Sequence, residues 1–423
     1  MTQSASRPQT LSLWRQQDFR NFWVGHTASQ FAAQFTTIAL PLIAVLALGA
    51  APDDVGILRA AGQLPFFLFA LFAGVLVDRW RRRNVLILAD LGRAGALAVV
   101  PVAYAMHLLG MPLLYVVGFL VGVFTVFFDV AYQAYLPRLV DREQLTQGNS
   151  MLESSRSAAQ IGGPALGGSL VSLVTAPVAV LASTLFFLMS ALAIGRIERS
   201  EPVPEASARP GSTFGQIREG LGLVTRDAVL RTVAITAGIF NFFFTAFMTI
   251  YIVFLSRDLH LSGAMIGLCM AAFGPGFLVG ALLAAKLPKR FGYGVVLVAA
   301  AAISDAVMLG VAALHDPGPV TVVLLIVINF LFGAFAQTFN VSLMAVRQAI
   351  TPDHIQGRAA ATIRFIGVGL APLGALLGGF VGGEIGLRVS VLLAAVGMCL
   401  APVFLVTSPL ARVGRELPKP AAS

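Results

Sequence analysis

The sequence has few charged residues for its length. Aspartate, glutamate, lysine and arginine make up 12% of the 423 residues, whereas a soluble globular domain carries about 25%. Hydrophobic residues make up 57%, and a soluble protein of this composition would expose large apolar patches to water. The composition therefore excludes an ordinary soluble domain.

Cysteine and the motifs of catalysis are also scarce. The two cysteines, Cys269 and Cys399, both lie inside apolar runs, so we expect buried free thiols and neither a disulfide nor a metal site. The phosphate-binding motif G-x-x-x-x-G-K-[ST] does not occur, so we expect no ATP-driven step in this chain. We predict a protein that is not an enzyme and that has no cofactor.

Long apolar runs dominate the sequence instead. Many contain about twenty residues or more, long enough for a helix to cross the ~30 Å hydrocarbon core of a bilayer. The alternating strands of an outer-membrane barrel are not visible. The sequence therefore predicts an all-α membrane protein with twelve transmembrane helices. The expected spans are approximately 19–48, 55–78, 84–107, 112–136, 148–173, 176–197, 229–255, 262–287, 292–314, 319–346, 358–383 and 387–408.

The positive charge gathers on one side of these spans. The formal net charge is +9. The turn at 79–83, the link at 198–228 and the turn at 286–290 hold many of the basic residues and fall on the same side as both termini. Because lysine and arginine collect in cytoplasmic loops, we expect both termini in the cytoplasm and the chain in the inner (plasma) membrane. The charge then orients the chain, and we expect no nucleic-acid partner.

One link between spans is much longer than the others. In it, Phe214, Ile217, Leu221 and Val224 recur at helical spacing after a proline-rich stretch, which predicts an amphipathic helix on the membrane surface. The predicted divisions are a cytoplasmic N-terminal tail at 1–18, a six-helix bundle at 19–197, a cytoplasmic linker at 198–228, a second six-helix bundle at 229–408 and a cytoplasmic tail at 409–423.

The two bundles repeat each other in sequence. A shift of 211 residues places Gly56 on Gly267, and after a small gap a shift of 208 places Pro164 on Pro372. Such a repeat predicts two pseudo-symmetric bundles related by an axis along the membrane normal.

The turn between the second and third spans carries a recognisable motif. Residues 74–83, GVLVDRWRRR, resemble the cytoplasmic motif A of the major facilitator superfamily, and the resemblance covers essentially the whole chain. It implies that family's two-bundle fold and a gate in which Asp78 lies near the N-terminus of span eleven, where a carboxylate interacts favourably with the helix dipole. The alternative is that the arginines only orient the chain. The gating residues would be Gly74, Asp78, Arg79 and Arg83.

A second motif, GGPALGG at 162–168 in span five, resembles the antiporter motif of exporters in this superfamily. Glycines permit close backbone approach, and proline softens a helix, so both suit a helix that rocks; simple helix packing is the alternative. With LPRLV at 136–140 and QGN at 147–149, it looks most like the branch of enterobactin exporters and macrolide efflux proteins. The antiporter-like residues are Gly163, Pro164, Gly167 and Gly168.

Ionisable residues inside the spans are candidates for function, because they are costly there unless paired or wet. The resemblance implies that span four lines the central cavity, so Asp129 is the first proton-carrier candidate. Glu153 and Arg156 stand at i, i+3 in span five and can pair, and they form the second candidate. We expect Asp305 to lie in a peripheral span.

Polar side chains among phenylalanines follow spans one, seven and ten. A polar stripe facing lipid is costly, so we expect these stripes to face the pore or another helix. Such a wall suits an amphiphilic organic ligand. The cavity candidates are Gln30, Phe31, Gln34, Asn241, Phe244, Thr245, Thr249, Asn329, Gln337 and Asn340.

We therefore predict a secondary active transporter that exports an amphiphilic small molecule, such as a drug, an antibiotic or a siderophore-like compound, by proton antiport with alternating access. Its partners would be the small-molecule substrate, protons and the lipid bilayer, and we expect a monomer. The alternative is an importer or facilitator of a small polar nutrient or metabolite.

Overall fold

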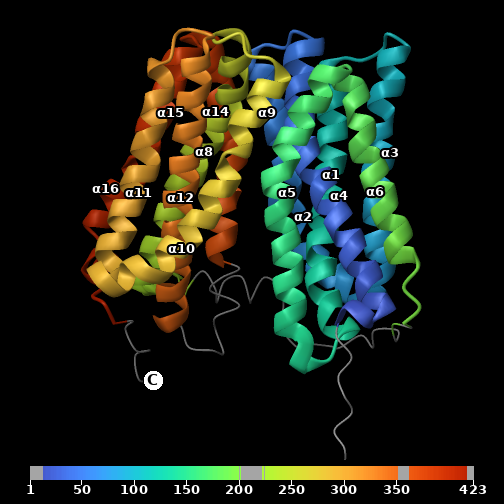
Figure 1. Cartoon of the computed structure of the whole chain (residues 1–423), viewed down its shortest axis with the longest axis horizontal. Helices are drawn as coiled ribbons and strands as arrows, with labels where there is room; N and C mark the ends of the chain where they lie inside the picture. Colours follow the sequence, from blue (N-terminus) through green and yellow to red (C-terminus); the bar gives the residue numbers. More distant parts are fainter. Residues whose placement is uncertain (1–12, 200, 202–221, 223, 351–361, 417–423) are drawn as a thin grey trace, which may run out of the picture.

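The computed structural model describes residues 13–199, 201, 222, 224–350 and 362–416, without the side chains at 70, 71, 75, 78, 142 and 350. Its helices form two bundles that stand side by side (Figure 1). The first bundle contains α1 (Gln17–Leu42), its π-helical extension η2 (Ile43–Ala47), α2 (Pro52–Arg79), α3 (Arg82–Ala105), α4 (Met111–Leu139), α5 (Leu145–Leu173) and α6 (Ala176–Gly195).

The second bundle repeats this plan with more interruptions. It contains α8 (Ala228–Arg257), α9 (Gly263–Ala271), α10 (Phe273–Phe291), α11 (Tyr293–Leu309) with the 3₁₀ turn η4 (Gly310–Ala313), α12 (Pro319–Ile350), α14 (Ala371–Glu384), α15 (Leu387–Met398) and α16 (Leu400–Val406). The pairs α9–α10 and α15–α16 each make one span, and residues 362–369 continue α14 in the N-terminal direction.

The predicted fold of twelve helices in two bundles is confirmed. In the described part of the chain, ten spans are long and apolar enough to cross a membrane. The other two, α2 and α5, contain 28 and 29 residues, and at about 1.5 Å per residue they are also long enough. Of the amphipathic segment predicted in the linker, Val224 is described; it is helical and buried against the second bundle. The residues 214, 217 and 221 of that segment and the start of span eleven lie outside the described residues.

A proline follows each interruption in the second bundle. The helices break at Ala272, Leu370 and Cys399, two or three residues before Pro275, Pro372 and Pro402 respectively. Proline has no N–H to bond the carbonyl four residues earlier, and its ring crowds the residue before it. The first bundle keeps its helices unbroken although α2, α3 and α5 also contain internal prolines.

Two junctions hold the bundles together: α5 packs against α9, and α2 packs against α14. In the first, a Cβ added at Gly267 would lie 2.5 Å from the Pro164 carbonyl oxygen. In the second, a Cβ added at Gly56 would lie 2.7 Å from the Ala375 carbonyl oxygen. Only glycine allows backbones to approach this closely.

These junctions correct the predicted register of the repeat. Gly267 and Gly56 are equivalent at a shift of 211, and their contacts make Pro164 equivalent to Ala375, which is the same shift. The prediction that Pro164 falls on Pro372 is therefore wrong. A coincidence of two prolines was weaker evidence than the glycines that make the contact.

Both junctions lie at the end of the molecule opposite to the chain ends. α1 begins and α16 ends at the lower end in Figure 1, which we call the terminal end, whereas α9 bridges the bundles near the other, distal end. Hydrogen bonds reinforce the distal contact. Arg257 donates to the carbonyl oxygens of Gly49 at 2.9 Å and Ala50 at 2.5 Å, and the Ala264 N–H donates to the Ser172 hydroxyl at 2.7 Å.

The motif-A turn at the terminal end is anchored inside the first bundle. The Arg83 side chain donates to the carbonyl oxygens of Ile194 and Gly195 at the end of α6. Glu201 accepts from the Arg82 guanidinium at 3.1 Å and from the Arg83 backbone N–H at 3.2 Å. The turn thus fastens α3 to α6, while the side chain of Asp78 lies outside the described part of the structure.

Candidate functional site

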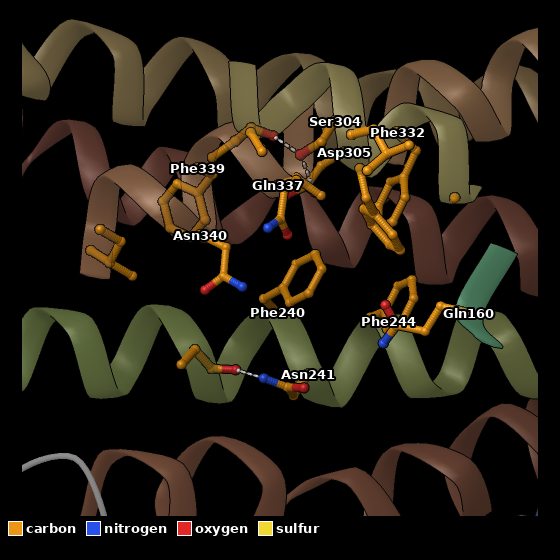
Figure 2. Close-up of a pocket in the computed structure, with 18 of the residues that line it drawn as sticks. Gln160, Phe240, Asn241, Phe244, Ser304, Asp305, Phe332, Gln337, Phe339 and Asn340 are labelled. Atoms are coloured by element: carbon orange, nitrogen blue, oxygen red, sulfur yellow. Dashed lines mark hydrogen bonds between the residues drawn. The ribbon is translucent and has the colours of Figure 1, made fainter. Parts of the chain in front are cut away.

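A cavity of about 470 Å³ lies between the bundles. α5 of the first bundle forms one wall, and α8, α10, α11 and α12 of the second bundle, with Ala401 of α16, form the rest. Figure 2 shows Gln160 of α5 at one side and side chains from α8 and α12 facing each other across the space. The volume suits a drug-sized organic molecule, because typical ligand pockets measure about 300–1,000 Å³.

Stacked aromatic rings form the apolar part of the wall. The rings of Phe240 and Phe244 on α8 are parallel, with centroids 5.2 Å apart. Phe244 stacks in turn on Phe332 of α12 at 5.4 Å with an interplanar angle of 2°. The i, i+4 spacing of the first two residues places them one turn apart on the same helix face. The wall therefore contains a cluster of aromatic rings, side chains that attract apolar groups and cations.

Amide side chains add polar groups to the same wall. Asn241 donates to the Ala237 carbonyl oxygen at 2.8 Å on its own helix. Gln337 and Asn340 line the cavity, and both make no hydrogen bond to the part of the chain that the structure describes. Their donors and acceptors are available to a ligand or to water.

An ion pair lies on the α5 side of the cavity. The Arg156 guanidinium donates to the Glu153 carboxylate, with Nε–Oε2 at 2.9 Å, and the two side chains are 44% and 59% exposed. The predicted i, i+3 pairing is thus confirmed, and both residues line the cavity. An ion pair with this much exposure contributes little to stability, so its position matters more than its strength.

Asp129 of α4 is half-buried and lies outside the cavity wall. It has no hydrogen-bond partner among the described residues. The positive charges close enough to act on it belong to Arg93, Arg364 and Arg156. Arg364 belongs to the second bundle, and its guanidinium lies 5.3 Å from the ring of Phe66 on α2 of the first bundle. The first proton-carrier candidate therefore lies within electrostatic reach of both bundles.

A buried charge pair lies inside the first bundle. Arg93 pairs with Asp90, and these side chains are 2% and 0% exposed. Ser29 of α1 bonds both of them, and the guanidinium lies between the rings of Phe128 and Phe187, at 4.4 and 4.3 Å from their centroids. This pair is sealed inside the bundle and joins α1 to α3.

The predicted cavity residues divide into three groups. Asn241, Phe244, Gln337 and Asn340 line the cavity. The polar stripe of α1 packs on the glycines of α5 instead: a Cβ added at Gly163 would lie 2.6 Å from Cβ of Gln34, and one at Gly162 would lie 3.3 Å from the Phe31 ring. Gln30 of this stripe is half-buried and lies outside the wall.

The remaining candidates are buried inside the second bundle. Thr245 is 7% exposed and Thr249 is fully buried, and the Thr249 hydroxyl donates to the Thr245 carbonyl oxygen at 2.8 Å. Asn329 is also fully buried; it donates to the Tyr251 hydroxyl at 2.9 Å and to the Cys269 carbonyl oxygen at 2.8 Å. The prediction that Asn329 completes the cavity wall is therefore wrong, because it joins α12 to α8 and α9.

The antiporter-like motif lies at the centre of these contacts. Gly163 and Gly167 pack against Gln34 and Phe35 of α1 in the same bundle, whereas Gly168 packs against α9 of the other bundle. The motif therefore gives α5 two close neighbours on different faces, and Gly168 belongs to the distal junction.

Two polar residues gain importance from the structure. Asp305 of α11 lines the cavity, although we predicted from the sequence that its span is peripheral. His26 of α1 is 1% exposed, with its ring centroid 4.8 Å from that of Tyr132. Each is a single ionisable residue in an apolar run, and that rarity was the available signal.

Comparison with known proteins gives a consistent result. The family model described as "Transmembrane secretion effector" matches residues 9–421. The multidrug efflux pump Tap of Mycolicibacterium fortuitum is 28% identical over 385 residues, covering 89% of this chain and 92% of the relative. Macrolide efflux protein A of Streptococcus pyogenes is 22% identical over 265 residues, covering 63% of this chain and 65% of the relative.

Solved structures support the same architecture. A bacterial homologue of the iron transporter ferroportin superposes with a TM-score of 0.75 at 14% identity, covering 93% of this chain and 98% of the other. A bacterial homologue of the lysosomal transporter Spinster superposes with a TM-score of 0.70 at 14% identity, covering 92% and 95%. At these identities the likeness establishes the fold alone.

Proposed function

Because the chain belongs to the transmembrane secretion effector family, in the efflux branch of the major facilitator superfamily, we propose that it exports an amphiphilic organic molecule in exchange for protons. The observation that carries this proposal is the cavity between the bundles. Its stacked rings and its free amides suit a molecule that is largely apolar with a few polar groups.

The two glycine junctions are the contacts that would open and close during transport. They hold the bundles together at the distal end through backbone contacts. Because glycine has no side chain, the two surfaces can separate without the rearrangement of large interlocked side chains. Rocking of one bundle against the other would separate them and open the cavity to the distal side. Substrate would enter from the terminal side, which we assign to the cytoplasm. The chain would lie in the inner membrane of the cell as a monomer.

The proton would be carried by Asp129. Its carboxylate can take up a proton without losing a hydrogen bond to the described part of the chain, and Arg364 of the other bundle acts on it. A proton on Asp129 removes an attraction between the bundles, so proton binding and bundle separation are linked. Glu153 is the alternative carrier; it lies on the cavity wall but must first leave Arg156.

The gate at the terminal end would depend on Asp78. When the bundles close there, its carboxylate would meet the N-terminus of span eleven. Arg83, which is fastened to the end of α6, would hold the turn in position, with Gly74 and Arg79 completing the motif.

Transport into inside-out membrane vesicles tests the proposal. With an acidic lumen, vesicles containing the protein should accumulate a fluorescent amphiphile, and a protonophore should abolish the accumulation. Vesicles without the protein are the control. Accumulation that persists after the proton gradient collapses would contradict proton exchange, and accumulation only in right-side-out vesicles would mean import.

A further inference from the structure

Asp305 is an isolated acid in the second bundle. It lies in α11, contributes to the cavity wall and is 1% exposed. Its hydrogen-bond partner among the described residues is the neighbouring Ser304 hydroxyl at 3.1 Å. A carboxylate removed from water with one neutral partner is poorly compensated.

The charges around the cavity do not compensate it. The ionisable side chains of the described wall are Glu153, Arg156 and Asp305, and the first two pair with each other. The wall therefore carries one net negative charge when its carboxylates are ionised. The other titratable group on which Asp305 acts is the Cys399 thiol at the α15–α16 break, which is not a cation.

The surroundings of this acid favour an organic cation over a metal ion. Phe240, Phe244 and Phe332 line the same cavity with stacked rings, whose faces attract cations. Thr236 also lines it, is 2% exposed, and has a hydroxyl without a hydrogen-bond partner in the described part of the chain. Figure 2 shows Asp305 on the α11 side of the cavity, and the Phe332 ring stacks on that of Phe244. No group of metal-ligating residues occurs among the described residues.

We propose that Asp305 is the counter-ion for an organic cation, so that the preferred substrates are amphiphiles with an ammonium or phosphonium group whose apolar part lies on the phenylalanine stack. This inference rests on the proposed function and adds the class of substrate. Arg156 would be held away from the ligand by Glu153, and the positive group of the ligand would be bound at the α11 side.

Equilibrium binding to the purified full-length chain tests the inference with two probes of similar shape. Methyltriphenylphosphonium carries a positive charge, and triphenylphosphine oxide is neutral. The wild-type chain should bind the cation more tightly. Asp305→Asn should weaken binding of the cation by about tenfold or more, because an interaction with a charged group is lost, while binding of the oxide should change little. Asp305→Glu should restore part of the preference.

Asp316→Asn is the matched control, because Asp316 is an exposed acid just beyond the end of the same span, and it should bind both probes as the wild type does. Retained oxide binding also shows that Asp305→Asn is folded. Equal affinity of the wild type for both probes, or an unchanged preference in Asp305→Asn, would overturn the inference. Vesicles that export the oxide but show no preference for the cation would leave export standing and reject the role of Asp305.

Discussion

Gly168 of α5 and Gly267 of α9 meet backbone to backbone across the two bundles. A Cβ added at Gly168 would lie 2.7 Å from the Cα of Gly267, closer than real Cβ atoms approach a neighbour. The equivalent pair, Gly56 and Gly379, makes the same contact between α2 and α14, with a Cβ at Gly56 2.9 Å from the other Cα. The distal closure is therefore a symmetric pair of contacts that need glycine.

Gly168→Ala should disfavour the state closed at the distal end. The added methyl group has backbone on its far side and cannot be accommodated by a rotamer change, so we expect a cost of about 1–3 kcal/mol and a population shift away from this state. Cysteines introduced at Ser172 and Ala264, which are hydrogen-bonded here, should cross-link less efficiently in the variant. Gly383→Ala is the control, because an added Cβ there meets no atom within 4 Å. Equal cross-linking in both variants would contradict the prediction.

Asn329→Leu should destabilise the second bundle without a direct effect on the ligand. The substitution removes the amide that donates to Tyr251 and Cys269 and leaves their oxygens buried without that donor, at a cost of about 1–3 kcal/mol. Thermal unfolding of the purified chain should begin at a lower temperature, while the affinity for an amphiphilic dye stays the same in the folded fraction. Tyr251→Phe removes one member of the same group and should cost less. A loss of dye affinity with unchanged stability would mean that Asn329 faces the cavity after all.

The fold could be predicted because the bilayer imposes it. A membrane helix is recognised by its length, its apolar character and the side on which the basic residues lie, and all three can be read along the sequence. The positions of the helix breaks were harder to predict from the sequence. Pro164 lies in an unbroken helix and Pro372 follows a break, so a proline alone does not determine whether the helix continues.

The cavity could be predicted only in part, because periodicity identifies a helix face but not its neighbour. Gln34 has the same kind of pattern as Asn241, yet it packs against Gly163 of α5 while Asn241 lines the cavity. Glycine leaves room for the Cβ of this glutamine, where a larger residue would have displaced it. Asp305 was expected at the periphery for a related reason: the family resemblance assigned a place to its span, but not the direction of one side chain.

Asp78→Asn should impair transport without changing the orientation of the chain. The arginines that fix orientation remain, and Arg83 keeps its bonds to the end of α6, but the charge that would meet the N-terminus of span eleven is lost. Initial rates of dye export in vesicles should fall, while protease accessibility of the termini stays that of the wild type. Asp53→Asn is a control at the other end of the same helix. Unchanged export in Asp78→Asn would reduce the turn to an orientation signal.

Asp129→Asn should uncouple transport from the proton gradient while leaving ligand binding intact. The carboxamide cannot exchange a proton, and it also removes the attraction to Arg364 of the second bundle, so the variant should resemble the protonated state at every pH. Dye export should then lose its response to an imposed pH difference.

Arg364→Gln removes the other partner, and the double variant should add little to either single change, because the two residues share one interaction. Asp141→Asn, at an exposed acid beyond the end of α4, should keep the pH response. If Asp129→Asn still responds to the gradient and Glu153→Gln does not, Glu153 carries the proton, and the pair with Arg156 on the cavity wall becomes the coupling element.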